Sequence, residues 1–367
     1  MSLNAAKKLI ESLGLNINDD KLGNPYMRGL GVIASTLCIE GFKPIKQANS
    51  PRKVAFIDGG NQEIIGAPNF SIQLNRICSS LWQGTERISE NFVPRRIEFF
   101  SATFSCIKNE EIFYDTALFP LSETEKTLPN EADLSFSSRD RSLMRGNRRA
   151  DIVNVMGIGR RFAELVLATE VTENQLTQGD IVVLDGTLQT AFPNENKYLQ
   201  QLRTSAKSKG VILAGLSKTS SLFTDTGYSL LGALDKLSPK EYKESEWYYP
   251  VVDLALKDHY VMLLGVKLNS ISDRIFRLEI DRDQYLSLSD IEIDEILTQL
   301  VRNSTDFTFP GYPYGLIDAD RFARVSNSEL LYHRALFFSQ MANTNTLDKF
   351  HRHINAADAH SLLNTLG

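Results

Sequence analysis

The chain has 367 residues, of which 42% are hydrophobic and 23% are charged. This length is enough to bury a substantial core in one large domain or two smaller ones. Its five histidines and three cysteines (Cys38, Cys78 and Cys106) have neither zinc-ligand spacing nor a disulfide framework, so a zinc protein is not expected. The start lacks the apolar region of a signal peptide, and no run is long enough to span a membrane. We therefore expect a cytoplasmic protein, and its net charge of −5 predicts no general affinity for nucleic acid.

The elements predicted in chain order are those of an α/β protein. Residues 1–48 are predicted to be helical, and three β segments follow: KVAFIDGG (53–60), EIIGAPNFSIQLNRICSSLW (63–82) and RRIEFFSATFSCI (95–107). After a polar stretch at 121–138 and an arginine-rich region, we predict a helix at 156–170, a strand at 181–188, a helix at 193–208 and a strand at 211–218. Two strands within 250–281 and a mostly helical end complete the pattern. We divide the chain into a helical segment (1–48), a central domain (49–340) and a helical tail (341–367).

Two similar phrases, VAFIDGG at 54–60 and IVVLDGT at 181–187, each place one aspartate at the end of an apolar β run. These aspartates are Asp58 and Asp185. A carboxylate beside a sheet core is costly unless a metal ion, a partner or solvent stabilises its charge. Two carboxylates at equivalent strand ends therefore predict a shared cation site. The alternative for each copy is an ordinary strand followed by a DG turn.

Positive charge is concentrated between residues 139 and 161. Only Asp140 and Asp151 oppose seven arginines there: Arg139, Arg141, Arg145, Arg148, Arg149, Arg160 and Arg161. Because guanidinium groups form forked hydrogen bonds with phosphate oxygens, this segment is a candidate for holding a nucleic-acid backbone. The alternative is a solvated helix or loop surface.

Glu164 lies in the apolar sequence FAELVLA, one helical turn after Arg160 and Arg161. A salt bridge to either arginine is one interpretation of this acid. The other is a third carboxylate directed at Asp58 and Asp185.

The order Asp58-Gly59-Gly60, Glu164, Asp185-Gly186-Thr187 resembles the NurA nuclease family, whose core is similar to the ribonuclease H fold. Lys218, after VILAGLS, resembles a basic position that follows the family's third core strand. GYPYGLIDADRFARV at 311–325 resembles its C-terminal Tyr-Pro motif. The resemblance covers most of the chain. It implies a ribonuclease H-like mixed β-sheet core flanked by helices, with helical N-terminal and C-terminal segments.

The chain departs from the family pattern at two positions. Gly60 stands where relatives more often have serine or another small polar residue. Asp320 follows Ala319 where many relatives have Ala-His, so this chain has a fourth candidate acid. A carboxylate is a harder oxygen ligand than imidazole. Asp320 is a metal ligand in one interpretation and part of a polar helix face in the other, and His333 is an alternative source of the imidazole.

The resemblance implies a deoxyribonuclease that depends on Mn²⁺ or Mg²⁺ and uses two metal ions to hydrolyse phosphodiester bonds. Exonuclease activity is expected, with single-strand endonuclease activity beside it. The implied metal ligands are Asp58, Glu164, Asp185 and Asp320. The implied contacts to DNA come from Lys218, Tyr312, Arg148, Arg149, Arg160 and Arg161, although a buried structural role is the alternative for Tyr312.

The implied partners are DNA, a second copy of the chain and a HerA-type hexameric ATPase, in DNA end processing, repair or defence. The chain has no GxxxxGK(S/T) phosphate-binding loop, so ATP-driven movement would come from such a partner. A second hypothesis is a catalytically weakened DNA-binding or scaffold subunit of the same complex. A carbohydrate or phosphate-ester hydrolase is a weaker third hypothesis, because it leaves the arginines and the Tyr-Pro motif unexplained.

Overall fold

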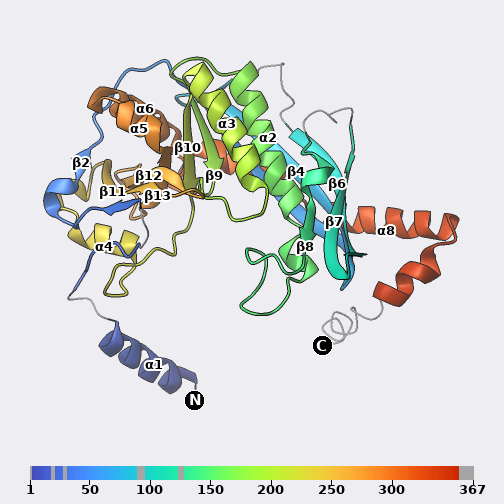
Figure 1. The fold of residues 1–367 in the computed structure, drawn as a ribbon. Coiled ribbons are helices and arrows are strands. Elements are labelled where there is room, and N and C mark those ends of the chain that lie inside the picture. Colours follow the sequence, from blue (N-terminus) through green and yellow to red (C-terminus); the bar gives the residue numbers. More distant parts are fainter. Residues whose placement is uncertain (1, 18–20, 28–30, 89–95, 123–127, 355–367) are drawn as a thin grey trace.

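The computed structural model describes residues 2–17, 21–27, 31–88, 96–122 and 128–354, which form a mixed sheet of 13 strands flanked by helices (Figure 1). The order along the sheet is β1-β11-β12-β13-β10-β9-β3-β4-β6-β7-β8, with β2 paired to β11 and β5 paired to β4. The strands are β1 (Val32–Ala34), β2 (Lys43–Pro44), β3 (Lys53–Ala67), β4 (Phe70–Gln83), β5 (Glu86–Ile88), β6 (Arg96–Lys108), β7 (Glu111–Pro120), β8 (Ser135–Ser137), β9 (Ile181–Asp185), β10 (Ile212–Ser217), β11 (Trp247–Ala255), β12 (Tyr260–Lys267) and β13 (Phe276–Asp281).

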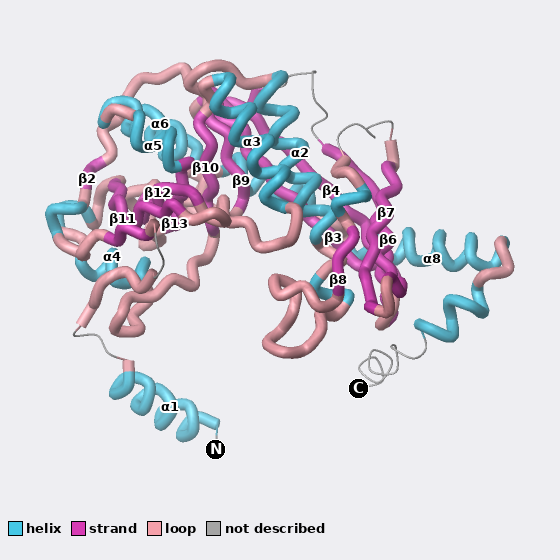
Figure 2. The backbone as a smooth tube through the Cα atoms, in the orientation of Figure 1, coloured by secondary structure: helices cyan, strands magenta, loops and turns pink. Residues whose placement is uncertain are grey.

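Helices cover both faces of the central strands (Figure 2). Along β3, Ala55 and Ile57 belong to the core beneath α2 and α3, whereas Val54 and Phe56 belong to the core beneath α6 and α7. This alternation is the two-residue period of a strand that is buried on both faces. The helices are α1 (Ser2–Asn16), α2 (Ile158–Asn174), α3 (Glu195–Lys209), α4 (Leu230–Leu237), α5 (Arg282–Ser287), α6 (Asp290–Asn303), α7 (Tyr314–Ala323) and α8 (Asn327–Asn343).

The predicted α/β class and most of the central elements are confirmed. The three β segments form the antiparallel meander β3-β4-β6, although the segment at 63–82 is divided between the end of β3, which runs to Ala67, and β4. The predicted helices and strand at 156–170, 193–208 and 211–218 correspond to α2, α3 and β10. The end of the chain is mostly helical as far as residue 354. The rest of the predicted tail, 355–367, lies outside the described residues.

Two of the predicted elements are wrong. Residues 1–48 are helical mainly over α1, because β1 and β2 pair with β11 and Phe42 packs edge-on against Trp247 and Tyr249. The region 250–281 contains residues of three strands rather than two. These are β11, which begins before the region at Trp247, and the whole of β12 and β13.

Helix α1 stands apart from the sheet in Figure 1, and none of its residues is buried. Its apolar side chains include Leu9, Ile10 and Leu13, all of which are exposed. No helix among the described residues has both the length and the apolar character needed to cross a bilayer.

Candidate active site

The two aspartate phrases lie side by side in the sheet. Strands β3 and β9 are parallel and pair from Val54 with Ile181 to Ile57 with Leu184, so the next residue on each strand is an aspartate. Asp58 and Asp185 therefore point to the same face as Phe56 and Val183, the face covered by α6 and α7. The repeated phrase thus corresponds to a structural equivalence.

The sequence predicted that Asp58 lies at a strand end, and this prediction is wrong. Strand β3 continues to Ala67 because it pairs with β4 on its other side, with Asp58 opposite Cys78. The DG turn is present only in the second copy, where β9 ends at Asp185 and Gly186 has a φ of 107°. That backbone conformation favours glycine.

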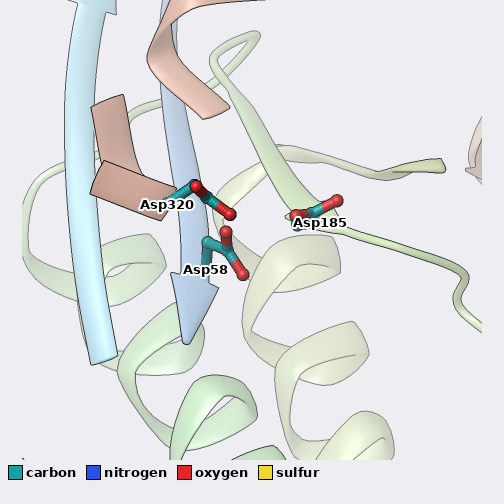
Figure 3. A group of neighbouring side chains, drawn as sticks. All are labelled: Asp58, Asp185 and Asp320. Carbon is teal, nitrogen blue, oxygen red and sulfur yellow. The ribbon is translucent and has the colours of Figure 1, made fainter. Parts of the chain in front are cut away.

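A third aspartate joins this pair from helix α7. One carboxylate oxygen from each of Asp58, Asp185 and Asp320 lies within 4.8 Å of the others (Figure 3). The helix comes close to β3 at Gly60, where a Cβ atom would lie 2.4 Å from the carbonyl oxygen of Ala323. Gly60, the first departure from the family pattern, therefore leaves room for the helix that carries the second departure, Asp320.

Glu164 approaches from the opposite face of the sheet and is not part of this three-aspartate group. It is buried on α2, where Arg160 forms a short ion pair with Oε1 and Arg161 Nη1 lies 3.2 Å from Oε2. Arg160 also donates a 2.9 Å hydrogen bond to the carbonyl oxygen of Gly59. Glu164 therefore forms the salt bridges that one of the two interpretations predicted. Because Arg160 also binds the backbone of β3, these salt bridges hold Glu164 beside that strand.

Lys218 lies among the three aspartates. Its Nζ is 2.7 Å from Asp185 Oδ2, 3.1 Å from Asp320 Oδ1 and 3.9 Å from Asp58 Oδ2. Lys218 follows β10, the parallel neighbour of β9. Asp185 and Lys218 thus lie where the parallel strands β9 and β10 end, the kind of edge at which open α/β sheets commonly bind ligands.

The negative charge at this site exceeds what Lys218 neutralises. Burial and the nearby charges of Asp185 and Glu164 raise the pKa of Asp58 from 3.8 to about 8, although Lys218 opposes the shift. Carboxylate oxygens are the ligands that Mg²⁺ and Mn²⁺ prefer. The donor set and its charge therefore fit a divalent cation.

Tyr312 is fully buried and supports Asp185. Its hydroxyl donates a 3.0 Å hydrogen bond to Asp185 Oδ1, and its ring packs against Phe276 and Phe309. The ring has no exposed face for a base, so the predicted stacking role is not available to it in this structure. Its place among these rings agrees with the structural alternative.

The acids open into a cleft of about 640 Å³. Asp58, Glu164, Asp185, Asp320, Lys218, Arg160 and Arg161 all line it. Arg148 and Arg149 do not line it. Both are exposed in the loop that leads into the first turn of α2, and Arg149 borders a separate hollow of about 760 Å³ with Arg139 and Arg141.

His333 is not among the residues that line the cleft. It packs on α8 against the rings of Phe100 and Tyr332. The structure therefore does not place this histidine with the three aspartates.

One acid in the cleft was missed by the sequence analysis. Glu195, in the first turn of α3, is buried and binds Arg161 Nε at 2.8 Å. It also accepts hydrogen bonds from the backbone N–H groups of Ala191 and Phe192. An acidic residue at a helix start was the available signal, but such residues are common at helix starts without any binding role.

Comparison with known proteins identifies the fold and the family. The family model of the NurA domain matches residues 52–325. The crystal structure of the NurA nuclease from Sulfolobus solfataricus aligns over 93% of this chain and 94% of its own, with a TM-score of 0.50 and 14% identity. The catalytic domain of human Endonuclease V aligns over 88% of this chain and 94% of its own, with a TM-score of 0.36 and 12% identity. No curated protein shows a significant sequence match.

The mixed sheet with acids gathered at its central strands, together with the family match, assigns the chain to the α/β nucleases. The chain belongs to the NurA family of nucleases, since the family match spans most of its length.

Proposed function

We propose that the protein is a metal-dependent deoxyribonuclease that hydrolyses phosphodiester bonds, with exonuclease activity and single-strand endonuclease activity. The observation that carries the proposal is the convergence of Asp58, Asp185 and Asp320 within 4.8 Å, in a chain of a nuclease family. These three acids would hold Mn²⁺ or Mg²⁺, with Glu164 on the far side of Asp58. When bound, two such ions supply a nucleophile from water at neutral pH and neutralise charge at the phosphate.

Lys218 and Arg160, which line the cleft, would bind and orient the substrate, while the buried Tyr312 would hold one of the acids. Lys218 carries its charge on a flexible stem and is 37% exposed, so it can turn from the aspartates to a phosphate oxygen. Arg160, at the cleft wall, holds Glu164 and offers a second positive charge. Tyr312 holds Asp185 by its hydroxyl and thereby fixes the direction of that carboxylate.

The DNA strand would follow the positive charge from the cleft toward the loop that carries Arg148 and Arg149. This loop joins the end of α2 at which Arg160 lies (Figure 1). Phosphate contacts of this kind supply affinity without sequence preference.

Family membership supports a HerA-type hexameric ATPase as partner, a homodimer and a role in DNA end processing, repair or defence in the cytoplasm. We place the contact with a second copy or the motor in residues 1–48. Helix α1, with its exposed Leu9, Ile10 and Leu13, supplies an apolar surface for it.

The proposal is tested by cleavage of end-labelled single-stranded and double-stranded DNA with Mn²⁺, Mg²⁺ or EDTA, with and without the cognate ATPase. Wild type is compared with Asp58→Ala, Asp320→Ala and the control Asp348→Ala, which removes an exposed carboxylate outside the cleft. We expect metal-dependent cutting by wild type and the control, and none by Asp58→Ala. Asp320→Ala should lose activity because that carboxylate belongs to the three-aspartate group.

A different result would favour the second candidate function. All four acids lie within 4 Å of cationic side chains, which are Lys218 or the two arginines of α2. This arrangement is also compatible with a non-catalytic DNA-binding subunit. If folded wild type binds DNA or the ATPase but cuts no DNA with either metal, the scaffold function replaces the nuclease.

A further inference from the structure

A buried acid outside the cleft, Glu279, contacts the segment of chain that follows Asp185. Glu279 lies on β13 and is 0% exposed. Its Oε2 accepts a 2.7 Å hydrogen bond from the backbone N–H of Leu188. Its Oε1 forms a short ion pair with Arg277 and lies 3.0 Å from His259 Nε2. A buried charge is costly unless it is paired, and both oxygens of this carboxylate have partners.

The charged form of Glu279 is favoured despite its burial. Burial by itself raises the pKa of the group, but His259 and the charge of Arg277 outweigh it and hold the pKa below its usual value. Glu279 is thus an anion when it accepts the hydrogen bond from Leu188, and hydrogen bonds to charged acceptors are the stronger kind.

The chain between Asp185 and Leu188 is fixed at both ends. It leaves β9 through the left-handed Gly186, whose N–H donates a 2.9 Å hydrogen bond to the carbonyl oxygen of Leu216. It then crosses β10 at Gly215, where a Cβ atom would lie 2.8 Å from the carbonyl oxygen of Gly186. Beyond this crossing it reaches Glu279, the residue paired with Gly215 on β13.

This segment connects two parts of the cleft. It starts at Asp185, and the carbonyl oxygen of Thr187 accepts a 3.3 Å hydrogen bond from Arg161 Nη2. Arg161 in turn binds Glu164 and Glu195. A shift of residues 186–188 would therefore move Asp185 and Arg161 together.

We propose that Glu279 is a positioning residue of the nuclease site, which fixes residues 186–188 and thereby keeps Asp185 beside Asp58. For its effects on metal binding and turnover, this inference rests on the proposed function. Its effect on the backbone is independent of that function.

The test compares Glu279→Gln with Asp281→Asn. In Glu279→Gln, one amide oxygen replaces two carboxylate oxygens, so Leu188 and Arg277 compete for a single acceptor. Asp281 is a matched control because it is buried on the same strand, two residues further on, and pairs with Arg203 instead of the 186–188 segment. Both variants lose one buried carboxylate and its ion pair.

Three quantities are measured for each variant: amide hydrogen exchange of residues 186–188, the Mn²⁺ dissociation constant by calorimetry, and kcat and KM for DNA cleavage. We expect faster exchange in Glu279→Gln, Mn²⁺ binding weaker by about 10-fold to 100-fold, and a lower kcat with little change in KM. Asp281→Asn should retain the wild-type exchange and Mn²⁺ affinity.

Unchanged exchange at 186–188 in folded Glu279→Gln, or equal effects of the two variants, would overturn the inference. If wild type neither binds Mn²⁺ nor cuts DNA but exchange rises in Glu279→Gln alone, the proposed function fails while the backbone anchor stands. If Glu279→Gln does not fold, the double variant Arg277→Gln/Glu279→Gln, which leaves no unpaired guanidinium, is measured against the same predictions.

Discussion

Lys218 Nζ lies 2.7 Å from Asp185 Oδ2, an oxygen of one of the carboxylates that are proposed to hold a divalent cation. A second aspartate oxygen, on Asp320, is 3.1 Å from the same nitrogen. The ammonium group would therefore compete with a divalent cation for the charge of the aspartates. Partial burial lowers the pKa of Lys218, but the hydrogen bond and charge of Asp185 outweigh it and raise the pKa above its usual value.

We predict that Lys218→Met binds Mn²⁺ about tenfold more tightly than wild type, which corresponds to about 1.4 kcal/mol. DNA cleavage should fall in the same variant, because the ammonium group that competes with the metal is also proposed to hold the phosphate. Calorimetry and steady-state kinetics measure the two effects separately. Lys197→Met, which removes a lysine paired with Asp133 outside the cleft, is the control. Equal Mn²⁺ affinities for wild type and Lys218→Met would refute the competition.

The close approach of β3 to α7 predicts the effect of restoring a family-like side chain at Gly60. Gly60→Ser would place its Cβ atom against the carbonyl oxygen of Ala323, so α7 must move. We expect a loss of about 1–3 kcal/mol in the free energy of unfolding, the usual range for overpacking. Cleavage should fall as well, since α7 carries Asp320.

Thermal denaturation and the DNA cleavage assay measure these two effects. Gly157→Ser is the matched control, because no atom within 4 Å would meet its Cβ atom and its φ of −88° suits any residue. A variant at residue 60 as stable and active as this control would show that α7 tolerates the side chain.

The loop that carries Arg148 and Arg149 predicts a salt-dependent effect on DNA binding. Arg148→Gln/Arg149→Gln should weaken binding to double-stranded DNA and reduce the slope of log K against log salt concentration by about 1 to 2, because each lost phosphate contact contributes about 0.9. Fluorescence anisotropy at several salt concentrations measures the slope. Lys207→Gln/Lys209→Gln removes two exposed charges from the last turn of α3 and is the control. The same slope in both double variants would exclude the loop from the DNA path.

Glu329, in the first turn of α8, predicts a contribution to stability in acid. The hydrogen bond from Arg76 and those from Ser326 lower the pKa of Glu329 from 4.5 to about 2. The folded state therefore favours the charged form. The stabilisation is complete above the ordinary pKa and is lost as the pH falls toward about 2.

The melting temperature of Glu329→Gln should accordingly lie below that of wild type at about pH 6, and the difference should shrink steadily below about pH 4.5. Glu86→Gln, at an exposed position, should match wild type throughout. A difference that stays constant with pH would contradict the assignment.

Local signals explain what the sequence predicted correctly. The apolar runs of β3, β4 and β6 and the repeated phrase around Asp58 and Asp185 are visible in short windows. The pairing of β1 and β2 with β11 depends on contacts far apart in the chain, so it leaves no comparable signal. The strand FRLEID, with Arg277 and Glu279, alternates like a half-exposed strand, yet both of its faces are buried. Glu279 was missed for that reason.

The wide separation of the three aspartates along the chain has a consequence for its synthesis. Asp58, Asp185 and Asp320 come from three distant segments. Of these three segments, α7 is synthesised last, and it supplies the third carboxylate. Contacts between distant segments form slowly because a long loop must close first. A nascent chain that still lacks α7 would therefore lack one carboxylate of the proposed metal site, and the proposed cleavage of DNA would begin only once the domain has folded.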